Sequence, residues 1–223
     1  MKYKYVVVDF GKVLAVPPTG NWYLTPKFLE LVGMDEIDQE NFDDILKEHR
    51  QKLLDIIDVK TLDEEYEMFY KFYYNFLKDL KYQGDIENVS KEIAYDRVYS
   101  TTKYKLCDNL FNELDNLKNK YKLIMLTDNY PDIVDFLRET KVDEYFEKIY
   151  VSSLYAMTKK NIKFFEEVIK DFDIKPGEAL FIDDVESNLD NAVKCGFDCL
   201  LMDRYCSNNK NSKYKIINNL ENI

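Results

Sequence analysis

The stretch VVVDFGKVLA, residues 6–15, decides the fold of this chain. Its three valines lead directly into Asp9, a pattern that predicts a buried strand delivering one carboxylate to the edge of a sheet. Two positions later stands Gly11, where many enzymes built in this way carry a second carboxylate. The stretch therefore raises the question whether Asp9 is a nucleophile and, if so, what replaces the missing second carboxylate.

Helices and strands alternate along the second half of the chain. From about Asp108 onward, amphipathic helical patterns separate the short apolar stretches KLIMLT (122–127), KIYVSS (148–153), EALFID (178–183) and FDCLLM (197–202). This alternation predicts an α/β fold, a Rossmann-like parallel sheet with helices on both faces. Ligands of such sheets bind beyond the carboxyl ends of the strands. We expect the Asn- and Lys-rich tail, 207–223, to be partly frayed.

The chain between the first strand and this alternating region has only helical patterns. Thr25-Pro26 is typical of a helix start and Gly33 of a helix end. Thr61 followed by Glu64 fits a capping box that opens a helix through Leu80. These signals predict a separate helical segment.

We interpret residues 1–15 and 99–223 as an α/β core domain and residues 16–98 as an inserted all-helical cap domain. One helix of the insertion carries apolar side chains at three- and four-residue spacing, which favours a helix-bundle core over a substrate pocket. These side chains are Phe69, Tyr70, Tyr73, Phe76 and Leu77.

Composition excludes several classes of protein. A net charge of −11 argues against a nucleic-acid binder. The chain has no apolar run of the ~20 residues that a membrane span needs, and its N-terminus has no signal-peptide pattern, so we expect a cytoplasmic protein. Without a CxxC pair, the four cysteines are expected to be reduced and structural. The single histidine, His49, lies in a charged stretch that we expect to be an exposed helix, and it cannot supply a histidine metal site or a Ser-His-Asp triad.

Four short motifs fall at the same end of the predicted sheet. Converging carboxylates repel one another unless a cation lies among them, and Mg²⁺ prefers oxygen ligands. A carboxylate can also attack phosphorus, while a hydroxyl and an ammonium hold the transferring oxygens. The set therefore suits phosphoryl transfer. The motifs are Asp9-Phe10-Gly11, Thr127-Asp128-Asn129, Thr158-Lys159-Lys160 and Asp183-Asp184.

These motifs resemble those of the haloacid dehalogenase superfamily, in the branch with a helical cap inserted between the first and second motifs. The resemblance covers essentially the whole chain in order and spacing. It rests on VVVDFGKVL, LIMLTDN, the TKK segment ahead of a helix, and LFIDDVESN followed by Ala192 and Gly196.

The resemblance implies a nucleophile and a metal site. Asp9 would be the nucleophile and a Mg²⁺ ligand, and the backbone carbonyl of Gly11 would be a second ligand. Asp183 and Asp184 would complete the site, with Asn188 supporting it from behind the ligands.

The resemblance also implies a phosphate-binding set. Thr127, helped by the amide of Asp128, would bind the phosphoryl oxygens. Lys159 would pair with Asp9 and neutralise charge in the transition state. Lys160 competes for this role, but the position of Lys159 relative to the following apolar helix residues favours Lys159.

The sequence departs from the usual phosphatase pattern at Gly11, where an Asp commonly serves as general acid and base. Losing a positioned acid forfeits ~10² to 10⁴ in rate, which favours substrates whose leaving group departs without much proton help. We therefore expect a Mg²⁺-dependent phosphatase acting on a small phosphorylated metabolite, with a sugar phosphate as one candidate, as a monomer or a homodimer.

Two alternatives stay open. A catalytically impaired relative would bind a phosphorylated ligand or protein partner, for which Gly11 and Lys12 are the evidence. A 2-haloacid dehalogenase ranks lower, because that branch usually has an aromatic residue at the position of Gly11 and lacks the paired acids Asp183-Asp184.

Overall fold

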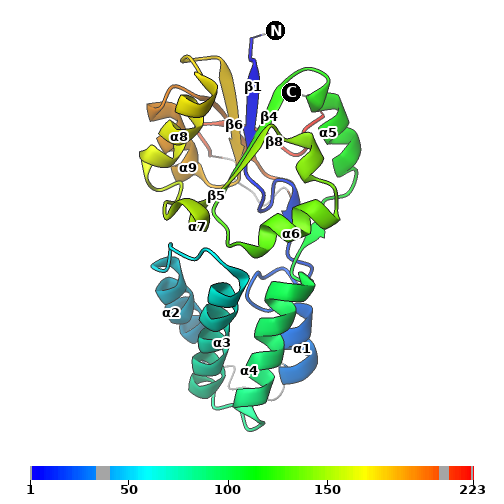
Figure 1. The fold of residues 1–223 in the computed structure, drawn as a ribbon, viewed down its shortest axis with the longest axis vertical. Coiled ribbons are helices and arrows are strands. Elements are labelled where there is room, and N and C mark those ends of the chain that lie inside the picture. Colours follow the sequence, from blue (N-terminus) through cyan, green and yellow to red (C-terminus); the bar gives the residue numbers. More distant parts are fainter. Residues whose placement is uncertain (1, 34–40, 206–210, 222) are drawn as a thin grey trace. The chain divides into compact units, whose positions relative to one another are not determined.

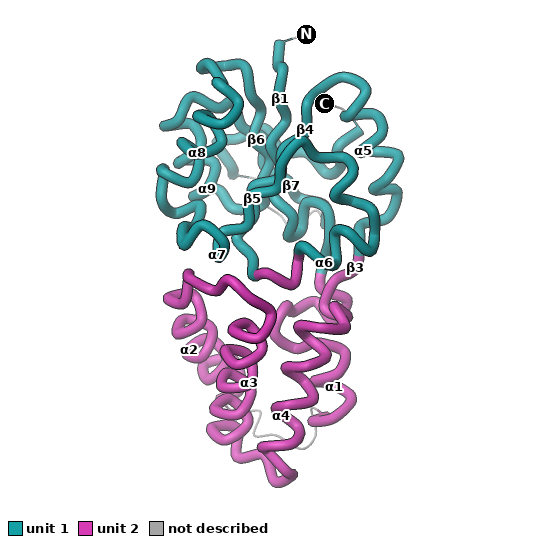
Figure 2. Tube along the Cα trace, viewed as in Figure 1, with its two compact units in different colours: residues 1–16, 106–130, 134–223 teal, residues 17–105, 131–133 magenta. Residues whose placement is uncertain are grey.

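The computed structural model of this protein describes residues 2–33, 41–205, 211–221 and 223. These residues form two compact units, shown in different colours in Figure 2. The α/β unit comprises residues 1–16, 106–130 and 134–223, and the helical unit comprises residues 17–105 and 131–133.

The α/β unit is built on a six-stranded parallel sheet in the order β5-β4-β1-β6-β7-β8. This confirms the α/β fold predicted from the alternating pattern. A separate two-stranded sheet joins β2 to β3. The strands are β1 (Tyr5–Val8), β2 (Ala15–Val16), β3 (Lys105–Leu106), β4 (Lys122–Thr127), β5 (Lys148–Val151), β6 (Ala179–Asp183), β7 (Asp198–Met202) and β8 (Lys215–Ile217).

Helices cover both faces of this sheet. Figure 1 shows α8 and α9 on one face and α5 on the other. The core on the α8 and α9 side is aromatic, with Phe165, Phe181 and Phe197 in mutual edge-to-face contact. The elements between the strands are α5 (Leu110–Lys118), α6 (Asp132–Glu139), η3 (Asp143–Tyr145), α7 (Ser152–Tyr155), α8 (Ile162–Phe172) and α9 (Glu186–Lys194).

Two details differ from the sequence prediction. Strand β8 lies in the tail that we expected to be frayed, and it pairs with β7 from Leu200 to Met202. The tail residues 207–210 and 222 are outside the described part. The stretch KIYVSS ends as a strand at Val151, because Ser152 begins the short helix α7.

The helical unit contains α1 (Pro26–Val32), α2 (Phe42–Leu54), α3 (Leu62–Asp79), α4 (Ile86–Tyr95) and a π-helical turn, η2 (Asp96–Ser100). Its predicted helix signals are confirmed. Thr25 caps the start of α1. The C-cap is Gly33 with φ 66°, a left-handed conformation that a residue without a side chain adopts at little energetic cost. Thr61 and Glu64 form the reciprocal capping box of α3.

The core of the helical unit is aromatic. Phe28 of α1 packs against Tyr73 and Phe76 of α3 at ring-centroid distances of 6.1 and 5.9 Å. Phe69 and Leu77 are also fully buried, whereas Tyr70 is half-buried. The aromatic stripe of α3 is thus packed in the core, as the spacing predicts.

The expectation that His49 lies on an exposed helix is wrong. His49 is buried on α2, and its Nε2 lies 2.8 Å from Oδ2 of Asp79. It shares the buried helix face with Phe42, Leu46 and Leu53. His49 is buried because it lies at helical spacing from these apolar residues, even though its neighbours in sequence are charged.

The helical unit extends further than the predicted insertion, which ended at residue 98. It continues to Lys105 and takes in Pro131–Ile133, so that α6 begins in one unit and continues in the other. The physical reason is a buried ion cluster: Lys103 contacts Asp132 and Glu65 within this unit.

Within the described part of the chain, no helix has both the length and the apolar character needed to cross a membrane.

Candidate active site

Three neighbouring strands of the α/β unit end in polar residues. The central strand β1 pairs in parallel with both β4 and β6. Asp9 follows β1, Thr127 closes β4 and Asp183 closes β6, and all three side chains are buried. Because the carboxyl ends of parallel strands meet at one edge of the sheet, this topology brings the three residues together.

Lys159 lies among these carboxylates. Its Nζ is 2.8 Å from Oδ1 of Asp9 and 2.6 Å from Oδ2 of Asp183. Only 1% of Lys159 is exposed to solvent, whereas Lys160 is exposed. Of the two adjacent lysines, Lys159 is therefore the one that contacts the carboxylates.

Asp183 is held by hydrogen bonds from the start of α9. Nδ2 of Asn188 lies 3.2 and 3.1 Å from its two carboxylate oxygens, and the amide of Val185 donates to Oδ1 at 2.7 Å. These bonds fix the orientation of the carboxylate. Asn188 therefore lies where the sequence predicts a supporting residue.

Asp184 faces the loop after β1. Its Oδ2 lies 3.4 Å from Nζ of Lys12, whose side chain is 56% exposed. Lys12 has φ 56°, a left-handed conformation that costs a residue with a side chain about 1–2 kcal/mol.

The loop after β1 is tightly wound. The carbonyl of Phe10 accepts hydrogen bonds from the amides of Val13, Leu14 and Ala15, and the amide of Lys12 donates to Ala15 at 2.7 Å. Gly11 lies within this loop, so its backbone carbonyl is held in a defined turn directly after Asp9. We call residues 10–14 the nucleophile loop.

The loop after β4 is anchored to the lysine segment and to α7. Oδ1 of Asp128 accepts a hydrogen bond from the amide of Lys159 at 2.9 Å. The amide of Asn129 donates to Oγ of Ser152 at 2.9 Å, and that hydroxyl lies 3.1 Å from the Asn129 carbonyl. The side chain of Asp128 thus positions Lys159, in addition to the role predicted for its amide.

Burial and like charge shift the titration of this cluster. Burial raises the pKa of Asp9 to about 7; Lys159 opposes this shift, whereas Asp183 and Asp184 add to it. Burial also raises the pKa of Asp184. For Lys159 burial alone lowers the pKa, but Asp183 and Asp9 outweigh it and raise the pKa above its usual value.

The residues fit a divalent cation. Carboxylate oxygens of Asp9, Asp183 and Asp184 lie within 4.8 Å of one another. Oδ1 of Asp9 is buried and accepts no hydrogen bond of good geometry within the described residues, although Lys159 is close. An oxygen-only donor set with an excess of negative charge suits Mg²⁺.

Sequence reasoning missed several polar contacts around this site. Ser152 anchors the loop after β4, whereas the sequence pattern predicts this serine in a strand. Arg204 donates to the carbonyl of Val13 in the nucleophile loop. No motif signals either contact, because each joins segments that only the folded topology brings together.

A second buried charge cluster lies in the helical unit. Nζ of Lys103 is 2.6 Å from Oδ2 of Asp132 and 3.5 Å from Oε1 of Glu65, and Oε2 of Glu65 accepts a hydrogen bond from the amide of Asp132 at 2.9 Å. Burial, with repulsion from Asp132, raises the pKa of Glu65 to about 9, while burial lowers that of Lys103. This cluster ties α3 to the first residue of α6.

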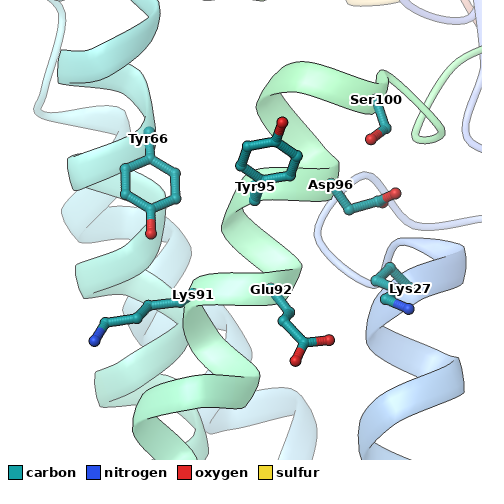
Figure 3. A pocket seen from close by; sticks show the side chains of 7 residues that line it. All are labelled: Lys27, Tyr66, Lys91, Glu92, Tyr95, Asp96 and Ser100. Carbon is teal, nitrogen blue, oxygen red and sulfur yellow. The ribbon is translucent and has the colours of Figure 1, made fainter.

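The helical unit also carries an open surface pocket of about 410 Å³. Figure 3 shows Tyr66 of α3, Tyr95 of α4 and Lys27 of α1 among its side chains. Lys27 and Lys91 are already paired with Glu30 and Glu87, at 3.0 and 2.6 Å. The pocket therefore offers no free set of cations for a phosphate, and the residues predicted to carry chemistry do not line it.

Comparison with known proteins places the chain in a family. Residues 23–202 match the family model described as haloacid dehalogenase-like hydrolase. A curated D-ribitol-5-phosphate phosphatase of Bacteroides thetaiotaomicron is 30% identical over an alignment 103 residues long, which covers 40% of this chain and 50% of that protein. The match thus spans about half the length of the curated relative.

Solved structures share the fold. The magnesium-bound HAD-hydrolase YfnB of Bacillus subtilis superposes with a TM-score of 0.71 at 18% identity, over 99% of this chain and 96% of that one. The L-2-haloacid dehalogenase of Xanthobacter autotrophicus gives a TM-score of 0.67 at 14% identity, over 98% and 96% of the two chains. At these identities the likeness is one of fold.

Proposed function

This chain belongs to the haloacid dehalogenase-like hydrolase family, and from that premise we propose that it is a Mg²⁺-dependent phosphatase of a small phosphorylated metabolite. One observation carries the proposal: the carboxylates of Asp9, Asp183 and Asp184 converge at one edge of the sheet, where Lys159 contacts the first two. Thr127 stands at the end of the adjacent strand.

In the proposed reaction a carboxylate oxygen of Asp9 attacks phosphorus, the bond from phosphorus to the leaving oxygen breaks, and the leaving oxygen takes a proton from water. Water then attacks the phosphorus of the aspartyl phosphate, releasing inorganic phosphate and restoring Asp9. Thr127 and the amide of Asp128 bind the phosphoryl oxygens, and Lys159 offsets their charge. Bound Mg²⁺, held by Asp9, the Gly11 carbonyl, Asp183 and Asp184, would supply charge neutralisation at the phosphoryl group.

Gly11 and the curated relative suggest different substrate classes. Without a carboxylate at Gly11, leaving groups that need little proton help, such as an anomeric sugar oxygen, are favoured. The relative is named for ribitol 5-phosphate, a primary alkyl phosphate. The informative panel therefore contains an aryl phosphate, an anomeric sugar phosphate and a polyol phosphate.

The test is hydrolysis of p-nitrophenyl phosphate with Mg²⁺, with EDTA, and by the Asp9→Asn variant. We expect turnover that requires both the metal and Asp9. Asp135→Asn is the matched control, because Asp135 is a half-exposed carboxylate paired with Arg138 and not with Lys159. Equal turnover by the Asp9 and Asp135 variants would refute the proposal.

A second candidate function is favoured by Gly11, namely a catalytically silent protein that binds a phosphorylated ligand. It predicts Mg²⁺-dependent phosphate binding without phosphate release. Dehalogenases share the fold, but dehalogenation ranks lower. Displacement of halide from carbon requires no metal ion, so it would not explain three converging carboxylates that suit one. Halide release from 2-chloropropionate that survives EDTA would favour it.

A further inference from the structure

Arg204 and Glu113 form a buried ion pair in the α/β unit. Nη2 of Arg204 lies 2.5 Å from Oε2 of Glu113, and Nη1 donates to Oε1 at 3.1 Å. The two side chains are only 8% and 3% exposed. Glu113 belongs to α5, and Arg204 follows the end of β7, so the pair joins two elements that are distant in sequence.

Arg204 also donates to the nucleophile loop. Its Nε donates to the carbonyl of Val13 at 2.7 Å, and the carbonyl of the next residue, Leu14, accepts from the amide of Cys107 at 2.9 Å. Two successive carbonyls of the loop are therefore fixed from outside. The internal hydrogen bonds to Phe10 transmit this restraint toward Gly11.

Arginine suits this arrangement better than lysine does. Its planar guanidinium donates two parallel hydrogen bonds to one carboxylate while a third N–H points elsewhere, whereas an ammonium has no such fixed fork. Glu113 occupies both terminal nitrogens and so orients Nε toward Val13. The carboxylate thus determines where Arg204 can bind the loop.

We propose that the Arg204–Glu113 pair positions the nucleophile loop so that the Gly11 carbonyl and Asp9 can bind Mg²⁺ together. This inference rests on the proposed function, because it concerns the metal site assigned there. Residues that orient metal ligands from outside typically change metal affinity about 10- to 100-fold when mutated. Arg204 and Glu113 are positioning residues in this sense and do not themselves touch the metal.

The test measures Mg²⁺ affinity directly by isothermal titration calorimetry, with the melting temperature in EDTA recorded for every variant. We expect Arg204→Met to weaken Mg²⁺ binding about 10- to 100-fold. Arg204→Lys keeps the charge but not the fork, so it should restore the melting temperature more than the affinity. The matched control, Leu117→Ala, removes a buried apolar side chain from α5 that can donate no hydrogen bond to Val13.

The double variant Arg204→Met, Glu113→Leu keeps the test informative if the single variant fails to fold. It removes both charges together and so leaves no buried carboxylate unpaired, but it still removes the hydrogen bond from Arg204 to the Val13 carbonyl. It should fold and still bind Mg²⁺ more weakly than the wild type.

Two results would overturn the inference. The first is an unchanged Mg²⁺ affinity in a folded Arg204→Met variant or in the folded double variant. The Arg204–Glu113 pair would then only stabilise the fold. The second is an equal loss of affinity in Leu117→Ala at a similar melting temperature. Failure of the proposed function would give a different result. The wild type would bind Mg²⁺ and release no phosphate, while the Mg²⁺ affinities of the wild type and the variants could still be compared.

Discussion

Nζ of Lys159 lies 2.8 Å from Oδ1 of Asp9 and 2.6 Å from Oδ2 of Asp183, so one buried ammonium is shared by two carboxylates from different strands. Asp184 adds a third carboxylate, faced by the half-exposed Lys12. The buried part of the site therefore carries more negative than positive charge. This imbalance is what a divalent cation would relieve.

Replacing Lys159 by Met should affect both catalysis and stability. Loss of one charged donor to the transition state costs about 10²- to 10³-fold in rate. Asp9 and Asp183 also lose their buried partner, so the melting temperature in EDTA should fall, and Mg²⁺ should raise it more than in the wild type. Calorimetry with and without Mg²⁺ checks this, with exposed Lys160→Met as the control. A smaller Mg²⁺-induced rise in the variant would contradict the shared-lysine account.

Replacing Gly11 by Asp should change the leaving-group preference. Gly11 is not among the described glycines with positive φ, so a residue with a side chain meets no left-handed backbone penalty there. A carboxylate placed there as proton donor should raise the rate on ribitol 5-phosphate about 10²-fold or more and change p-nitrophenyl phosphate hydrolysis far less. Rates that rise equally for both substrates would show that proton donation does not limit the wild type.

Replacing Lys12 by Gly should strengthen metal binding without destabilising the fold. Glycine removes the left-handed strain of about 1–2 kcal/mol at φ 56°, and the exposed ion pair to Asp184 contributes less than about 1 kcal/mol. Removing a cation beside Asp184 also lowers the repulsion that Mg²⁺ meets. We expect an equal or higher melting temperature in EDTA and several-fold tighter Mg²⁺ binding by titration calorimetry. Weaker Mg²⁺ binding would instead assign Lys12 a supporting role in the site.

The buried Glu65 should make stability depend on pH. Its folded-state pKa of about 9 lies above that of an ordinary carboxyl group, so the folded chain holds a proton that the unfolded chain releases. The free energy of unfolding therefore falls as pH rises from about 5 to about 9, with a limiting slope of about 1.4 kcal/mol per pH unit.

The measurement is chemical denaturation across this range for the wild type and Glu65→Gln. Lys103, whose pKa burial lowers, acts in the opposite sense at the alkaline end, and Asp132 and Arg97 also face the cluster. The informative quantity is therefore the difference between the two proteins. As pH rises, the free energy of unfolding of Glu65→Gln should increase relative to that of the wild type. A difference in unfolding free energy that does not depend on pH would contradict the raised pKa of Glu65.

Much of the α/β fold was predictable from local patterns. The valines before Asp9, the stretch KLIMLT and the stretch ALFID are apolar runs bounded by polar residues, and each is a strand in the structure. Because parallel strands align their carboxyl ends, the same patterns also predict that Asp9, Thr127 and Asp183 lie near one another.

The unpredicted features depend on long-range packing. Strand β8 is a weakly apolar segment whose place is decided by pairing with β7. His49 is buried because its helix face packs inward, although its neighbours are charged. Lys103, Arg204 and Glu113 have ordinary surface residue types, and only the fold buries them with partners. Composition and spacing carry no signal for such pairs.

The central position of β1 has a consequence for folding during synthesis. This strand is synthesised before its two partners, β4 and β6, which are separated from it in sequence by the whole helical unit. Most contacts of the helical unit are closer in sequence and can form earlier. The nascent chain therefore carries the apolar strand Tyr5–Val8 without its sheet partners until the second half has been made, and an unpaired apolar strand is prone to aggregation.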